Sequence, residues 1–102
     1  MRMMLLVTFP TEKFNELCRQ GQVGPKIASI IEDTKPEAIY FGKGADGQRG
    51  AVAIVDVPTP ADLSQVTEPW YLTFDARIET SICMTPADIG KIDMEGLANK
   101  YA

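Results

Sequence analysis

The sequence predicts an α+β domain whose four-stranded antiparallel sheet carries helices on one face. The first observation is the spacing of apolar residues, which predicts segments in the order strand, helix, strand, strand, helix, strand. The second is that the strands predicted at 2–9 and 50–57 are apolar on both faces, as strands inside a covered sheet are. The third is the helix-starting tetrapeptide Thr-Pro-Ala-Asp, which occurs at 59–62 and again at 85–88.

A length of 102 residues predicts a single domain over 1–102, with residues 85–102 as a helical C-terminal tail. The net charge of −4 argues against nucleic-acid binding, which needs a basic face. The apolar opening at 3–7 stops at Pro10 and predicts a strand rather than a signal peptide. No run is long enough to span a bilayer, so we expect a cytoplasmic protein without membrane contact. Cys18 and Cys83 are isolated, so we expect two reduced, buried thiols.

The first half of the chain supplies a strand and an interrupted helical region. Strand 2–9 is followed by a helix for which Thr11 is the candidate N-cap. Gly21 suits a left-handed helix end, and Pro25 suits the first turn of a second helical segment. That segment stops at Lys35, because Pro36 follows. The apolar spacing predicts one buried face on each segment, formed by Phe14, Leu17 and Cys18 and then by Ile27, Ile30 and Ile31.

A hairpin and a second helix come next. Strands 37–42 and 50–57 flank a polar connection in which Asp46-Gly47 is the strongest turn signal. In strand 50–57, Ala51 and Ala53 share a face that a helix can approach closely. Pro69 lies inside helix 59–74, and we expect a kink there rather than two separate turns. The apolar stripe of this helix consists of Leu63, Val66, Trp70 and Phe74.

The last strand, 75–84, has a clean alternation that predicts one core face and one polar face. Thr85 then caps a short helix ending near Gly90, and a final helix at 93–101 frays unless it docks on something. The expected core face holds Ala76, Ile78, Thr80, Ile82 and Met84, and the polar face holds Arg77, Glu79, Ser81 and Cys83.

This order of elements is that of the ferredoxin-like βαββαβ arrangement, in which helices cover only one face of the sheet. The other face is apolar, because both central strands are apolar on both sides, and in water it would form a large exposed patch. Pairing two sheets face to face removes that patch. Burial of several hundred Å² at about 25 cal/mol per Å² amounts to roughly 10 kcal/mol before association costs. We therefore expect a homodimer joined through the sheet face.

Segments that carry a resemblance run through nearly the whole chain: Lys26-Ile27, Ile30-Ile31-Glu32, Lys35-Pro36-Glu37-Ala38, Tyr40-Phe41, Val55-Asp56-Val57, Glu68-Pro69-Trp70, Leu72, Phe74, Ala76, Ile78-Glu79 and Met84-Thr85-Pro86-Ala87-Asp88. They make the chain resemble the dimeric α+β barrel superfamily, and more closely an uncharacterised bacterial branch of small proteins within it. The resemblance implies the fold and the dimer. The wider superfamily includes cofactor-independent monooxygenases, haem-degrading enzymes, muconolactone isomerases and ligand-sensing domains.

Histidine is absent, which excludes Ser-His and Cys-His nucleophile pairs, His-ligated haem and His-containing metal sites. The chain departs here from the haem-degrading and His-dependent members of that superfamily. The acids Asp88, Asp93 and Glu95 lie at helix starts and in the tail, where the helix dipole explains them. We therefore expect no metal and no cofactor, and any general acid or base is Asp, Glu, Lys, Tyr or Cys.

The segment 42–47 has the letters of a GxGxxG phosphate loop, and 44–47 those of a GxxG nucleic-acid clamp. A phosphate loop needs a helix to begin there, so that its amides meet the anion. Here a strand follows, and the net charge opposes the clamp, so a hairpin loop is the favoured interpretation.

Three charged residues are weak candidates for catalysis. Arg77 and Glu79 lie two residues apart on one strand face, where Arg77 can anchor a carboxylate or polarise a carbonyl while Glu79 acts as base. The alternative for both is an ion pair within the chain or across the dimer. Asp56, near the end of an apolar strand, can act as acid or base if it is buried, and is a solvated turn-former if it lies at the strand's mouth.

Aromatic residues are candidates for a pocket between helix 59–74 and the sheet, suited to a flat or apolar ligand. Trp70 and Phe74 lie on the helix stripe and are also explained as core, whereas Tyr71 lies off it and can contact a ligand or partner. The candidate ligand-binding residues are Tyr40, Trp70, Tyr71, Arg77 and Glu79.

These observations indicate a small homodimer that binds a small molecule or a protein partner without catalysis, because no constellation of residues demands chemistry. The alternative is a cofactor-independent monooxygenase or isomerase that acts on a small aromatic or lactone substrate. An enclosed cavity into which Arg77 or Asp56 points would favour the enzyme.

Overall fold

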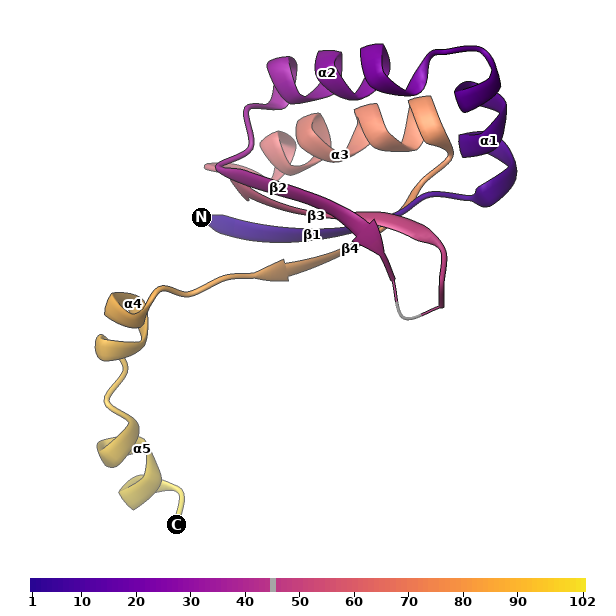
Figure 1. The fold of residues 1–102 in the computed structure, drawn as a ribbon. Coiled ribbons are helices and arrows are strands. Elements are labelled where there is room, and N and C mark those ends of the chain that lie inside the picture. Colours follow the sequence, from indigo (N-terminus) through magenta and orange to yellow (C-terminus); the bar gives the residue numbers. More distant parts are fainter. Residues whose placement is uncertain (45) are drawn as a thin grey trace.

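The structure is a computed structural model that describes residues 1–44 and 46–102. Its body has two layers, an antiparallel sheet and a layer in which α2 and α3 lie over one face of that sheet with α1 at its end (Figure 1). The strands are β1 (Arg2–Thr8), β2 (Ala38–Lys43), β3 (Arg49–Asp56) and β4 (Arg77–Ile82). The helices of the body are α1 (Thr11–Arg19), α2 (Val23–Thr34) and α3 (Pro60–Phe74).

The described residues form a four-stranded open sheet in the order β2-β3-β1-β4, and every neighbouring pair is antiparallel. The prediction that the two doubly apolar strands are central is confirmed, because β1 and β3 each have a strand on both sides. The architecture confirms the α+β class and is compatible with the ferredoxin-like arrangement.

The core lies between the sheet and the helices. Ala51 and Ala53 are buried, as predicted for a face that helices approach closely. An aromatic cluster closes the end near α1, where the ring of Phe9 lies 4.8 Å from that of Phe74 and 6.0 Å from that of Trp70, centroid to centroid. Aromatic pairs at these separations stabilise a core beyond their buried area.

Both Thr-Pro-Ala-Asp segments start helices in the predicted way. The amide of Asp62 donates to Thr59 Oγ1 at 3.3 Å, and the Thr59 amide donates back to Asp62 Oδ2 at 3.0 Å. Thr85 and Asp88 repeat this capping box at the start of α4 (Pro86–Gly90). Helix α3 continues as a single helix through Pro69, so the predicted stripe stays in register.

Three local expectations are wrong. Thr11 is not the N-cap of α1: Pro10 takes that position, and no described side chain caps the helix. The cysteines are not buried, because Cys18 is exposed and Cys83 is half-buried. The predicted core face of β4 is core only at its start: Ile82 and Met84 are exposed, because β4 is an edge strand and the helical layer does not cover its far end.

Residues 83–102, called the arm below, leave the body after β4 and carry α4 and α5 (Met94–Lys100). The arm extends on the side of the sheet opposite the helices (Figure 1). It gives the molecule extents of 59 × 28 × 19 Å and a radius of gyration of 17.0 Å. A compact domain of this length has a radius of gyration of about 13 Å. In the part of the chain that the structure describes, no helix is long and apolar enough to cross a bilayer.

Candidate functional site

The sheet face that no helix covers presents its side chains in rows across the strands. The neighbouring residues Val7 and Ala51 face the core, so the alternate positions on the same strands face away from it. Strand register joins one row of four across this open face, Tyr40, Val52, Leu6 and Glu79. It joins the next row in the same way, Gly42, Gly50, Thr8 and Arg77.

The second row leaves a hollow, because Gly42 and Gly50 have no side chains. The hollow belongs to an open groove of about 540 Å³. Its floor is formed by β1, β2 and β3, one wall by the β2–β3 connection and the other by β4. The lining residues are Leu6, Val7, Thr8, Tyr40, Phe41, Gly42, Lys43, Gly44, Asp46, Gly50, Ala51, Val52, Arg77 and Glu79.

The β2–β3 connection is a hairpin, as predicted, and not a phosphate loop. The Gly44 amide donates to the Gln48 carbonyl at 2.9 Å, and β3 follows directly. Gly47 has φ +79°, a conformation that favours glycine. The Gln48 amide donates to Asp46 Oδ1 at 3.0 Å, which orients the Asp46 side chain. Ala45, part of the formal GxGxxG segment, lies outside the described residues.

An ion pair connects the two walls of the groove. Arg77 Nη2 on β4 lies 3.8 Å from Asp46 Oδ2 on the hairpin, and these side chains are 69% and 48% exposed. An exposed pair at this separation contributes little to stability. Arg2, on the same sheet face, instead donates to Glu37 Oε2 at 2.8 Å, and this hydrogen bond raises the pKa of Arg2 above its ordinary value.

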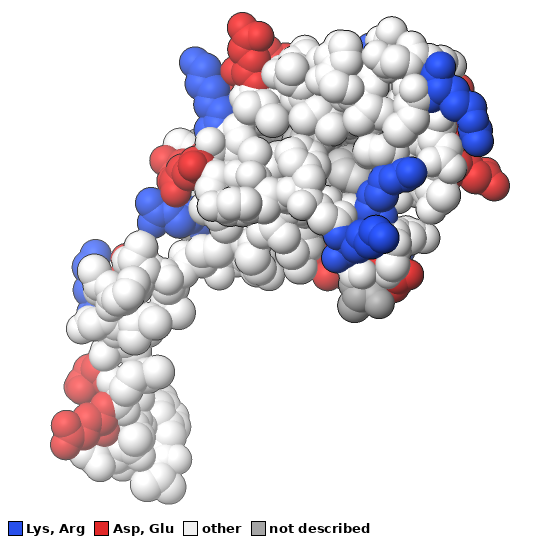
Figure 2. Space-filling model, in the orientation of Figure 1, with Lys and Arg blue, Asp and Glu red and all other residues white. Residues whose placement is uncertain are grey.

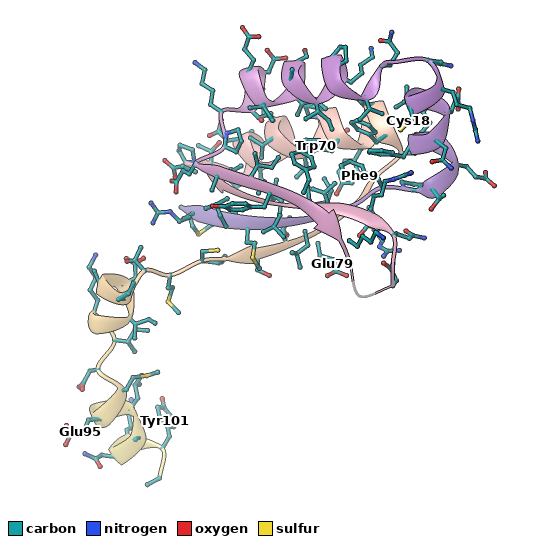
Figure 3. All side chains as sticks on the ribbon, in the orientation of Figure 1. Phe9, Cys18, Trp70, Glu79, Glu95 and Tyr101 are labelled. Atoms are coloured by element: carbon teal, nitrogen blue, oxygen red, sulfur yellow. The ribbon has the colours of Figure 1, made fainter. Side chains whose placement is uncertain are left out.

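Three of the predicted ligand-binding residues come together at the groove: Tyr40, Arg77 and Glu79 all line it. In Figure 3, Glu79 lies on the side of the sheet away from Phe9 and Trp70. Tyr40 is 70% exposed, so its ring is free to cover a ligand or a partner. The groove therefore combines an apolar floor with one guanidinium group, the Lys43 ammonium group, the carboxylates of Asp46 and Glu79, and one phenol.

The structure does not bring the other predicted residues to this groove. Trp70 is only 2% exposed and packs in the core, and Tyr71 lies on α3 in the helical layer. The space in which we expected a pocket, between that helix and the sheet, holds the cluster of Phe9, Trp70 and Phe74. Asp56 is exposed at the end of β3, where the Met1 ammonium group donates to its Oδ1 at 3.0 Å.

The groove also contains residues that the sequence analysis did not single out for function. Gly42 and Gly50 create the hollow, and Leu6, Thr8 and Val52 form its floor. A signal was present in the sequence: glycine inside a strand often marks a place where another group approaches the backbone closely. The sequence does not show that the two glycines are register partners until the hairpin is paired.

The described residues contain no group of three or more His, Cys, Asp or Glu side chains that could hold a metal ion. Chemically, the groove suits a small molecule with a flat or apolar body, and Arg77 suits an acidic group on it. No protein-family profile matches this chain, and no curated protein matches it.

Proposed function

We propose that this chain forms a homodimer through its open sheet face and binds a small, largely apolar acid in the groove, without catalysis. The observation that carries the proposal is the hollow beside Gly42 and Gly50, with Arg77 at its rim and apolar side chains on its floor. Ligand sites are typically concave, mostly apolar and supplied with a few polar groups that orient the ligand.

The dimer follows from the chemistry of the open face. Leu6 is 36% exposed at the middle of this face, and Met4, Val52 and Ile54 are only half-buried. Such a patch on a monomer marks a contact surface. A second sheet laid on it would remove the apolar side chains from water and turn the open groove into an enclosed cavity. Water exclusion in turn strengthens the pairing between Arg77 and an anionic ligand.

Arg77 is suited to ligand recognition because its present partner is easily displaced. The distance of 3.8 Å to Asp46 is longer than a charge-assisted hydrogen bond, and water reaches both side chains. A ligand carboxylate can replace Asp46 and accept two parallel hydrogen bonds from the guanidinium group. Tyr40 adds an aromatic ring beside the apolar body of such a ligand.

A second candidate is an isomerase or monooxygenase that needs no cofactor. One observation favours it: Glu79 lines the same groove as Arg77, so a base and a group that polarises a carbonyl border one space. Glu79→Gln separates the two proposals. If the chain only binds its ligand, Glu79→Gln leaves the affinity for that ligand nearly unchanged, and neither protein converts the ligand. If the chain is an enzyme, Glu79→Gln abolishes conversion of the ligand and retains its binding.

Ligand binding is tested by thermal shift and calorimetry with benzoate, a naphthoate, a simple lactone and benzoquinone. We expect an aromatic acid to bind more tightly than its neutral amide. Arg77→Ala should remove this preference, whereas Arg19→Ala, on α1 in the helical layer, should preserve it. Equal affinity for acid and amide in the unaltered protein would contradict the role of Arg77.

The dimer is tested by sedimentation equilibrium of two variants, each with one exposed leucine replaced by aspartate. Leu6→Asp places a charge on the open sheet face and should produce monomers. Leu72→Asp places the same charge on the outer surface of α3 and should leave the dimer intact. A dimer that survives Leu6→Asp would show that another surface joins the subunits.

A further inference from the structure

The arm exposes apolar side chains that no described residue of its own chain buries. All residues of α4 and α5 are described by the structure, and none of them is buried. Met94, Leu97 and Tyr101 follow each other at steps of three and four residues, so they lie on one side of the last helix and its C-cap. All three are exposed. The arm surface in view is largely uncharged, with acidic side chains gathered on one side (Figure 2).

The helices of the arm are well specified but too short to be stable alone. Thr85 and Asp88 form a capping box, and Asp93 Oδ1 accepts from the Gly96 amide at 3.0 Å. Yet α4 has five residues and α5 has seven. Isolated helices shorter than about 12 residues are marginal in water, and most helical stability comes from packing of an apolar face. The arm therefore requires a surface that its own body does not supply.

The position of the arm indicates where that surface lies. It extends on the open side of the sheet, away from α1, α2 and α3 (Figure 1). A second copy seated on the open face, as in the proposed function on which this inference rests, therefore lies alongside the arm. Because a two-fold axis relates the copies, each arm meets the other body in the same way.

The area of the sheet supports a contribution from the arm. Four strands about 4.8 Å apart and about 23 Å long give a face of about 450 Å². A standard stable interface buries about 800 Å² per partner. The helices of an arm, together about 18 Å long and about 10 Å wide, cover about 180 Å². Since each subunit both donates and receives an arm, the exchange adds about 360 Å² per subunit, which closes the difference of about 350 Å².

We propose that the arm, residues 83–102, packs on the body of a second copy of this chain, so that the two subunits of the dimer clasp each other with exchanged arms. Met94, Leu97 and Tyr101 face the partner.

The contact is tested in the full chain by photocrosslinking. A benzoylphenylalanine residue replaces Leu97 in one variant and Asn99, off the apolar side of α5, in a matched control. The Leu97 variant should give a covalent product of twice the subunit mass, and the control should give much less. In parallel, Met94→Asp with Leu97→Asp should raise the dimer dissociation constant about 100-fold or more, because two apolar contacts are lost. Asn99→Asp should change it less than about threefold.

The outcomes separate this inference from the proposed function. One outcome overturns the arm exchange and leaves the sheet interface. In that case Leu6→Asp breaks the dimer, the Leu97 probe gives no intersubunit product, and Met94→Asp with Leu97→Asp does not change the dimer dissociation constant. A dimer weakened by the arm variant but not by Leu6→Asp supports the arm and overturns the sheet interface. A protein that is monomeric at all concentrations overturns both.

Discussion

Gly50 on β3 lies so close to Val7 on β1 that a Cβ atom placed on Gly50 would be 2.6 Å from the Val7 carbonyl oxygen. Real Cβ atoms do not approach a backbone oxygen this closely, so the strands must separate if a side chain is added. The absence of a side chain at Gly50 therefore serves both the pairing of the two central strands and the hollow of the groove.

Gly50→Ala should lower the free energy of unfolding by about 1–3 kcal/mol, the usual cost of forcing a methyl group into a packed place. Gly42→Ala is the matched control, because a Cβ atom there would meet none of the described residues within 4 Å. Urea denaturation of both variants at one protein concentration measures the difference. Equal effects of the two substitutions would mean that β1 can move away from β3 at little cost.

Trp70→Ala should destabilise the fold by about 3–5 kcal/mol, because it removes the largest buried side chain, which packs on Phe9 and Phe74. Tyr71→Ala, one position away on the same helix, should cost less, because Tyr71 is 36% exposed whereas Trp70 is 2% exposed. Denaturant titration compares the two. A larger effect at Tyr71 would show that its side chain is covered in the assembled protein.

Asp46→Asn should change stability by less than about 0.5 kcal/mol, because the ion pair with Arg77 is exposed and long. The asparagine Oδ1 can still accept from the Gln48 amide, so the hairpin should keep its shape. Since Arg77 loses its competing carboxylate, affinity for an aromatic acid should rise up to about fivefold. Calorimetry with benzoate measures this, and a fall in affinity would instead make Asp46 part of the ligand contact.

Acid should loosen the start of α4. Hydrogen bonds from the Thr85 backbone and side chain hold the pKa of Asp88 below its ordinary value of 3.8. The folded state thus favours the carboxylate, so Asp88 stabilises the helix above its unfolded pKa, and this stabilisation is lost as pH falls through the lower, folded pKa. Carboxyl chemical shifts should titrate at that lower pH together with the α4 amides. In Asp88→Asn the α4 amides should show no such step.

Much of the fold could be predicted from the sequence, because the signals are local. Thr59 and Asp62 lie three residues apart, and this spacing of threonine and aspartate caps a helix without help from the rest of the chain. Asp46-Gly47 likewise makes a tight turn. The prediction of burial is wrong at Cys18 and Ile82. Each lies on the apolar side of its helix or strand, but no other described element covers that position. Coverage depends on where another element lies, which periodicity does not encode.

The sequence by itself determined the order of the elements, the two central strands, the helix starts and the exclusion of histidine chemistry, since each depends on residue type and short spacing. Only the tertiary structure decided that Tyr40, Arg77 and Glu79 share a groove while Trp70 fills the core on the opposite face of the sheet. It also decided that Gly42 and Gly50 lie side by side and that the arm stands clear of the body. These relationships arise from strand register and layer packing between segments far apart in the chain.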